Sequence, residues 1–199
     1  FARYKIFEQR IHAKYPEIKL IGSAGPDVTS NHYTDAWEFY RKEKKNNPNF
    51  VYAIDEHYYM PPKWFLEHND FYDNYPRDIK VFAGEYAAHD PEINIAHVSK
   101  NNCEAGISEG AFLTGMERNA DVVALSSYAP LFARVNYTQW APDLIWMDEN
   151  TSWGTPSYYV QKLFSKFRAE STLDLGDQIE KLRAQGIYCS AGETEDKTT

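Results

Sequence analysis

The chain has 199 residues, enough for one sizeable domain or for one domain and part of another. Its apolar fraction of 43% is that of a globular protein, and its formal net charge of −8 argues against nucleic acid or an anionic membrane as a partner. The two cysteines, Cys103 and Cys189, form no disulfide framework and lack metal-site spacing, and no run approaches the roughly 18 apolar residues of a membrane span.

The first part of the chain alternates between helices and short apolar strands. Apolar residues recur at three- and four-residue steps from Phe1 to Tyr15, which predicts an amphipathic helix that stops before Pro16. A short strand is predicted over 18–22, a helix over 34–45 and a buried strand over 50–54. This last strand runs into polar and aromatic residues, and a proline-started helical turn with an aromatic-rich loop follows it.

The alternation continues in the second part. The stretch 80–90 is predicted to be a third strand, whose apolar run 81–83 ends in Gly84, and a fourth strand is predicted over 121–125. Between them, residues 101–119 are predicted to form a helix that packs against a sheet through one stripe: Cys103, Ile107, Ala111 and Thr114. A further helix is predicted to begin at Thr155-Pro156, a capping residue followed by a proline at the first helical position.

Short apolar strands separated by helical crossovers indicate parallel pairing and the α/β class. The spacing of the units fits a doubly wound sheet or a (β/α)8 barrel. No glycine-rich phosphate loop follows any strand, which disfavours a nucleotide-binding protein. Polar and aromatic residues gather instead where strands end, at 55–59, 85–86 and 126–128. In barrels that end of the strands is the active face.

The character of the chain changes after Phe167. The remaining residues are polar and contain one strand-like run, 186–191, which ends among charges with nothing to pair against. We therefore expect 169–199 to be a linker and the first part of a second, truncated domain. The chain opens within a predicted helix and without a methionine, so we expect it to be a segment of a longer protein.

Glu85 is the candidate for chemistry, although a lone glutamate at a strand end is more simply explained as an ion-paired residue. His57, Tyr58 and Tyr59 end the preceding strand, and neighbouring strands lie about 4.8 Å apart. A tyrosine hydroxyl could therefore reach Glu85 and hold the carboxylate oriented as a nucleophile. Aromatic packing at a barrel rim is the alternative for His57 and its two tyrosines. Alternation along the strand sends the two acidic residues at 55 and 56 to opposite faces, so at most one points inward.

Several long segments resemble family 51 of the glycoside hydrolases, the α-L-arabinofuranosidases. These segments, in chain order, are RYKIFEQRIHAKYP, DEHYYMPPKWF, VFAGEYA, SEGAFLTGMERNADVVALSSYAPLF and PDLIWMDENTSWGTPSYYVQKLF. GIYCSAG, near the end, resembles the strand with which the C-terminal β-sandwich of that family begins.

The resemblance implies a fold and a set of site residues. Residues 1–168 would be the C-terminal half of a (β/α)8 catalytic TIM barrel, about strands 5–8, and 169–199 the linker and start of the β-sandwich. Glu85 would be the nucleophile that forms a covalent arabinosyl-enzyme. Tyr59 matches the tyrosine that hydrogen-bonds the nucleophile, and His57 matches a rim residue of the same substrate-binding pocket. Tyr128 and Trp140 are expected to form a wall of that pocket, with core packing as the alternative.

The acid/base residue has no match in this chain. In the family it belongs to an Asn-Glu pair located before the helix that opens this sequence. Retention requires a second carboxyl group about 5–5.5 Å from the nucleophile. A half barrel also leaves two open sheet edges. The polypeptide alone is therefore expected to be inactive and to require the N-terminal half of its own barrel.

The resemblance implies a retaining exo-α-L-arabinofuranosidase that acts on arabinose-containing polysaccharides or oligosaccharides such as arabinoxylan and arabinan. Neither a cofactor nor a metal is expected. One alternative is another retaining glycosidase of the same barrel clan, such as a β-xylosidase or an endoglucanase. The other is a non-catalytic, carbohydrate-binding relative. Family members include exported and intracellular forms, and export is the slightly favoured expectation.

Overall fold

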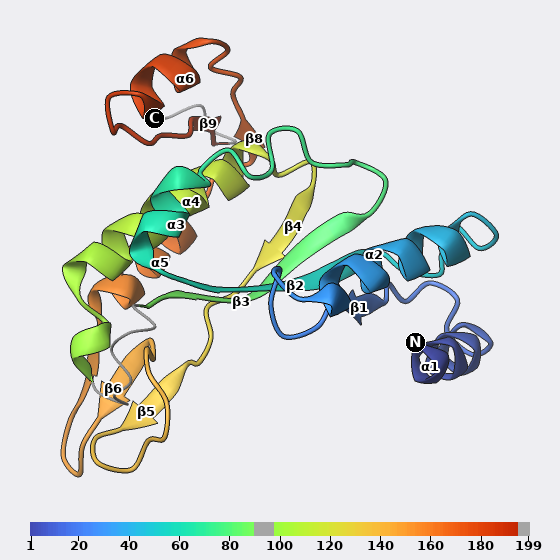
Figure 1. Ribbon diagram of the computed structural model, residues 1–199, viewed down its shortest axis with the longest axis horizontal. Coiled ribbons are helices and arrows are strands. Elements are labelled where there is room, and N and C mark those ends of the chain that lie inside the picture. Colours follow the sequence, from blue (N-terminus) through green and yellow to red (C-terminus); the bar gives the residue numbers. More distant parts are fainter. Residues whose placement is uncertain (90–97, 195–199) are drawn as a thin grey trace. The chain divides into compact units, whose positions relative to one another are not determined.

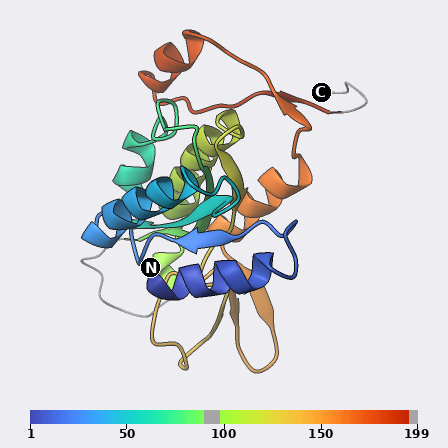
Figure 2. The same cartoon turned by 90° about the vertical axis from the view of Figure 1, so that its right-hand side faces the viewer.

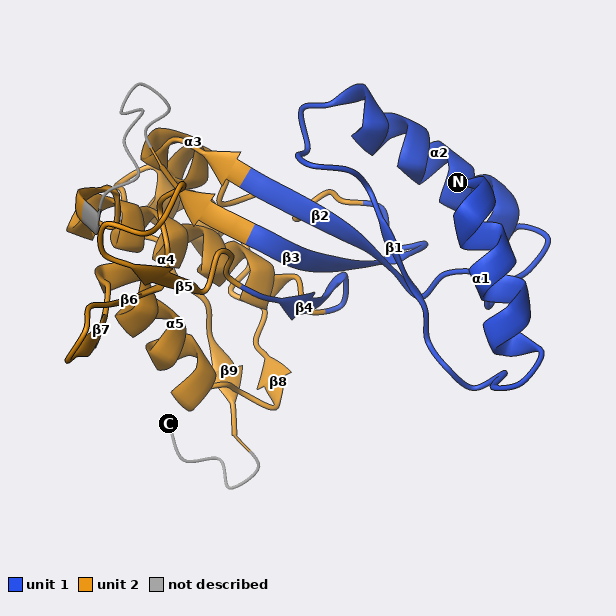
Figure 3. Cartoon of the chain, turned by 90° about the horizontal axis from the view of Figure 1, so that it is seen from below, with its two compact units in different colours: residues 1–58, 76–85, 121–127 blue, residues 59–75, 86–120, 128–199 orange. Residues whose placement is uncertain are grey.

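The structure is a computed structural model that describes residues 1–89 and 98–194 (Figure 1). The chain forms two compact units: residues 1–58, 76–85 and 121–127 make the first, and residues 59–75, 86–120 and 128–199 the second (Figure 3). The helices are α1 (Ala2–His12), α2 (Asn31–Lys44), α3 (Pro62–Glu67), α4 (Cys103–Arg118), α5 (Pro156–Lys166) and α6 (Gln178–Arg183). The strands are β1 (Ile21–Ser23), β2 (Ala53–Met60), β3 (Lys80–Ala88), β4 (Val123–Ser126), β5 (Phe132–Arg134), β6 (Ile145–Met147), β7 (Ser152–Gly154), β8 (Ser171–Thr172) and β9 (Gly192–Glu193).

The main sheet has the strand order β1-β2-β3-β4. β1 pairs with β2 in parallel, with Ser23 opposite Asp55, and β3 pairs with β4 in parallel, with Val81 opposite Val123. The arrows of β2 and β3 are neighbours that point the same way (Figure 3). Helices α2, α3 and α4 each lie in a connection between consecutive strands. The predicted α/β class with parallel pairing is confirmed.

Helices α1 and α2 accompany the sheet in the first unit, and α1 runs beside β1 (Figure 2). The buried face of α2 is made by Ala36, Trp37 and Tyr40. Tyr40 lies so close to β1 that a Cβ atom on Gly22 would be 2.2 Å from the tyrosine Cζ atom. Only glycine permits this approach of ring to strand, which explains why the strand begins with an isoleucine and a glycine rather than two bulky residues.

Two strands end close to the predicted positions. β2 runs to Met60, one residue past the predicted end at Tyr59, and β3 runs to Ala88, so Glu85 lies inside a strand rather than at its end. Gly84 does not end β3, because backbone pairing continues beyond it: the His89 N–H donates to the Met60 carbonyl at 2.9 Å. β1, by contrast, begins at Ile21 instead of residue 18.

In the second unit, α4 packs against α3 and α5. The predicted packing stripe of α4 is partly wrong, because Cys103 is exposed and the Ile107 side chain is 67% exposed. The helix instead buries the face that carries Ala105, Glu109 and Phe112. Small residues contact the neighbouring helix rather than a sheet: a Cβ atom on Gly106 would lie 3.0 Å from the Pro156 carbonyl carbon.

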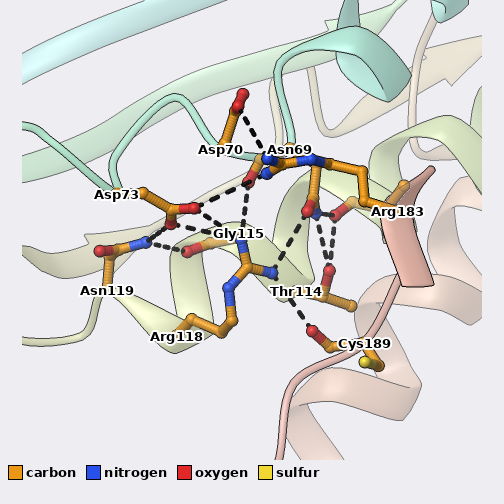
Figure 4. A network of polar contacts seen from close by, with 10 residues as sticks. Asn69, Asp70, Asp73, Thr114, Gly115, Arg118, Asn119, Arg183 and Cys189 are labelled. Atoms are coloured by element: carbon orange, nitrogen blue, oxygen red, sulfur yellow. Dashed lines mark hydrogen bonds and ion pairs between the residues drawn. The ribbon is translucent and has the colours of Figure 1, made fainter. Parts of the chain in front are cut away.

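A polar network within the second unit joins the loop after α3, the end of α4 and the C-terminal segment (Figure 4). The Arg118 guanidinium donates to the carbonyl oxygens of Asn69 and Cys189, each at 3.2 Å, and pairs with Asp73 at 3.3 Å. Arg183 of α6 pairs with Asp70 at 3.2 Å. These bonds hold the chain around Cys189 in an irregular path.

The predicted strand over 186–191 is therefore wrong, and so is the expectation that this region has nothing to pair against. The strand that forms is β9, which begins directly after that run, at Gly192, and it pairs with β8 in antiparallel fashion. The predicted domain boundary at 168/169 stays a prediction. The last five residues of that predicted segment, 195–199, lie outside the described residues.

A three-stranded sheet, β5-β6-β7, occupies the connection from β4 to α5 and was not predicted. Its strands have three residues each, too few to show a period-two pattern. Its core holds Ala133, Ala141 and Trp146, and the Trp146 indole N–H donates to the Asn101 side-chain oxygen at 3.0 Å. None of the helices in the described ranges has the length and apolar character needed to cross a membrane.

Candidate active site

Three side chains of the first unit meet where β2 and β3 run side by side. Asp55 and His57 come from β2 and Glu85 from β3. The Asp55 Oδ2 atom is 3.2 Å from His57 Nε2, and the Glu85 Oε2 atom is 3.4 Å from His57 Nδ1. The imidazole ring thus lies between two carboxylates. Its side chain is 14% exposed and that of Glu85 is 41% exposed, so the glutamate is the member open to a substrate.

The alternation of β2 explains this grouping. Residues two apart on a strand share a face, so Asp55 and His57 point the same way and Glu56 points the other way. Glu56 is fully buried and accepts hydrogen bonds from the Trp37 indole N–H, at 2.7 Å, and from the Tyr58 hydroxyl. The prediction that at most one of the two acidic residues shares a face with the site is confirmed, and that residue is Asp55.

His57 has a raised pKa. Burial lowers the pKa of the imidazole, but the hydrogen bond with Asp55, the charges of Asp55 and Glu85 and the Pro26 carbonyl raise it, and the net direction is upward. The loop after β1 is tied to β2 at this point, because the Val28 N–H donates to the His57 carbonyl at 3.2 Å. The arrangement therefore places an accessible carboxylate beside an imidazole whose pKa is raised, which suits a nucleophile that has to stay ionised.

Tyr59 and Trp140 belong to the second unit, where they form an aromatic cluster with His89. The ring centroids of Tyr59 and Trp140 are 5.1 Å apart at 82°, and His89 lies 5.8 Å from Trp140. Trp140 is 39% exposed, so part of its ring is available for contact. Sequence reasoning missed His89, although its place directly after β3 could have indicated it. The predicted hydrogen bond from Tyr59 to Glu85 stays a prediction.

Tyr128, the remaining predicted pocket residue, is only 7% exposed. The Asn101 side-chain amide donates to its hydroxyl at 3.1 Å, and its ring packs against Tyr86 with centroids 5.8 Å apart. Burial raises the pKa of the Tyr128 hydroxyl well above its ordinary value. This is the environment of a core residue. The predicted contact of Tyr128 with a sugar stays a prediction.

Glu109 of α4 is a buried carboxyl group that sequence reasoning also missed. It is fully buried, its Oε1 atom accepts a hydrogen bond from the Ala88 N–H at 2.8 Å, and its Oε2 atom has no hydrogen-bond partner among the described residues. Burial raises the pKa of Glu109 to about 8, and the Ala88 N–H opposes that rise. A helical projection of 101–119 could have located this glutamate on the buried face.

Within residues 1–89 and 98–194, no group of three or more His, Cys, Asp or Glu side chains could hold a metal ion. The donors that do meet, two carboxylates on one imidazole, are already paired with each other.

Comparison with known sequences found matches over most of the chain. The family model described as "Alpha-L-arabinofuranosidase C-terminal domain" matches residues 84–188, and the one described as "Alpha-L-arabinofuranosidase 1 domain" matches residues 1–77. An "Extracellular exo-alpha-L-arabinofuranosidase" of Streptomyces chartreusis is 46% identical over 185 residues, which are 92% of this chain and 20% of that protein. "Alpha-L-arabinofuranosidase A" of Aspergillus kawachii is 29% identical over 196 residues, 96% of this chain and 28% of that protein.

Comparison with solved structures also found an α-L-arabinofuranosidase. The solved structure of an arabinose-bound GH51 α-L-arabinofuranosidase superimposes with a TM-score of 0.74 at 27% sequence identity, over 98% of this chain and 29% of the other. The chain thus spans between a fifth and three tenths of the length of these relatives.

Proposed function

This chain belongs to the family 51 α-L-arabinofuranosidases, and we propose that it carries the nucleophile of a retaining exo-α-L-arabinofuranosidase. The observation that carries the proposal is the position of Glu85: a part-exposed carboxylate on a parallel strand, 3.4 Å from a His57 imidazole of raised pKa. The whole activity needs residues beyond these 199, since the relatives are several times longer.

The four parallel strands are proposed to be strands 5–8 of a (β/α)8 barrel. Their sequential order, with a helix in each connection, is the topology of such a barrel segment. Apolar residues on the two end strands support closure by further strands, because Ile21 of β1 is 39% exposed and Leu125 of β4 is 50% exposed. A cavity of about 750 Å³ is lined by residues of α1, β1 and α2, most of them apolar but with Arg3 and Glu8 among them, and an upstream unit is proposed to pack there.

The proposed reaction has two steps. The Glu85 carboxylate forms a bond to the anomeric carbon of a terminal α-L-arabinofuranosyl residue, while the bond from that carbon to the leaving oxygen breaks. A carboxyl group outside this chain protonates the leaving oxygen and then takes a proton from the water that releases arabinose. No cofactor takes part in this chemistry.

The sugar-binding wall is proposed to come from Tyr59, His89 and Trp140, because aromatic faces stack on sugar rings and Trp140 is partly exposed. Tyr59 is further proposed to hydrogen-bond Glu85, and His57 to border the same pocket. The substrate class is an arabinose-containing polysaccharide or oligosaccharide. Export from the cell is proposed on the strength of the Streptomyces chartreusis relative, whose name describes an extracellular enzyme.

The complete protein that contains this chain should hydrolyse 4-nitrophenyl α-L-arabinofuranoside and release the α-anomer of arabinose first, as seen by proton NMR within the first turnovers. Retention follows from two successive inversions, one at Glu85 and one by water. The control substrate, whose rate of cleavage is compared with that of the arabinofuranoside, is the aryl β-xyloside. Faster cleavage of the xyloside would show that the protein is a β-xylosidase. A first product of inverted configuration would show that Glu85 is not a nucleophile. Binding of arabino-oligosaccharides without any cleavage would indicate a carbohydrate-binding relative.

A further inference from the structure

We propose that Asp55 is a positioning residue for the nucleophile: it fixes the His57 ring so that one ring N–H points to Asp55 and the other to Glu85. This inference rests on the proposed function, since it assigns Glu85 the attacking role. Neither the strand pattern nor the comparisons assign a role to Asp55.

The two contacts of the His57 ring determine how many protons the ring carries. A neutral imidazole has one N–H donor and one acceptor nitrogen, whereas an imidazolium has two donors. His57 Nε2 faces Asp55 Oδ2 at 3.2 Å and Nδ1 faces Glu85 Oε2 at 3.4 Å, and an ionised carboxylate can only accept. A ring protonated on both nitrogens fits both the hydrogen bond with Asp55 and the ion-pair contact with Glu85, and a carboxylate on each side stabilises it.

Asp55 is held in place by β1 and by the shape of β3. Its backbone carbonyl accepts from the Ala24 N–H at 2.9 Å, and it lies opposite Ser23 in the β1–β2 register. The side chain lies against β3 where that strand has a glycine: a Cβ atom on Gly84 would be 1.9 Å from Asp55 Oδ1. Glycine immediately before Glu85 thus gives the Asp55 carboxylate the room to reach His57.

The charge of Glu85 changes during the reaction. When Glu85 bonds to the anomeric carbon, its carboxylate becomes a neutral ester and no longer balances the imidazolium. Asp55 does not react, so it keeps the ring charged and oriented through the covalent intermediate and until Glu85 is released. Among the described residues, the Pro26 carbonyl also contacts His57, and Tyr40 of α2 lies near Asp55: burial and then the charge of Asp55 raise the pKa of Tyr40 to about 12.

The test is Asp55→Asn in the complete protein, a substitution that keeps the shape and removes the charge. We expect kcat on the aryl arabinofuranoside to fall about 10- to 100-fold, the effect typical of losing a residue that orients a functional group. The titration of His57, followed by NMR with 13C-labelled histidine and assigned by its absence in His57→Gln, should move to lower pH. The matched control is Asp78→Asn, which removes an exposed carboxylate paired with Arg41 at 2.8 Å and should change neither quantity.

An unshifted His57 titration in Asp55→Asn would overturn the proposal, whether or not kcat falls, because a purely structural role would leave the ring's protonation unchanged. A shifted titration with unchanged kcat would overturn it as well. Failure of the proposed function is a separate result. It would appear as a wild-type protein without arabinofuranosidase activity, whereas the proposal on Asp55 is decided by comparing the variant with an active wild type.

Discussion

Replacing Glu85 by glutamine in the complete protein is expected to lower kcat on an aryl arabinofuranoside by on the order of 10⁴-fold or more. An amide cannot form the covalent intermediate. When catalytic residues act as one unit, removing a single member lowers kcat by a factor of this size. The fold should persist, because the Glu85 side chain is 41% exposed and an ion pair at that exposure contributes little to stability. Steady-state kinetics with a matched thermal unfolding curve measures both parts.

A second variant separates a nucleophile from an acid/base residue. With Glu85→Ala, added azide can take the place of the missing carboxylate, and the expected product is the β-arabinofuranosyl azide, which is inverted relative to the substrate. The control is Glu67→Gln, which changes an exposed glutamate paired with Lys63 and should leave kcat unaltered. An azide product of retained configuration would assign Glu85 to acid/base catalysis instead.

Glu109→Gln is expected to stabilise the protein at alkaline pH and to have little effect near pH 5. The ordinary pKa of a glutamate is 4.5, and burial raises that of Glu109 to about 8, so between these values the folded state keeps a proton that the unfolded state has lost. The free energy of unfolding therefore falls as pH rises through this window. Glutamine is neutral throughout, and it keeps an oxygen that can accept from the Ala88 N–H.

The expected difference at pH 9 is on the order of a few kcal/mol, because each unit of pKa shift corresponds to about 1.4 kcal/mol. Thermal unfolding of the wild type and the variant from pH 5 to pH 9 measures it. The two curves should meet at the acid end and separate as the pH rises. Glu104→Gln, an exposed position on the same helix, supplies the control and should run parallel to the wild type. Parallel curves for Glu109→Gln would mean that Glu109 is ionised in the folded protein.

Much of the sheet could be predicted because its strands are short apolar runs bounded by helices with clear periodicity. The parallel order β1-β2-β3-β4 follows from those crossovers. The ends of the strands could not be predicted, since Gly84 looks like a terminator although it lies inside β3. The three-residue strands β5, β6 and β7 and the pairing of β8 with β9 depend on tertiary contacts such as that between Trp146 and Asn101.

The candidate site was predictable only where residues are close in sequence or match a family pattern. Strand alternation places Asp55 and His57 on one face, and the comparisons show the family whose resemblance led to the proposed role of Glu85. The contact between His57 and Glu85 could not be predicted, because it depends on the register of β2 against β3. Glu109 was overlooked because a helical glutamate is ordinarily exposed, and its burial follows from the packing of α4 against α5.

The most direct test of the account is to inactivate the complete protein with a 2-fluoro-arabinofuranosyl reagent and to map the labelled peptide by mass spectrometry. The fluorine slows release of the covalent intermediate, so the sugar stays attached to the residue that attacked. We expect one added sugar on Glu85, in a peptide that contains Gly84 and Tyr86. A label on any other residue, or an active enzyme that the reagent never labels, would contradict it.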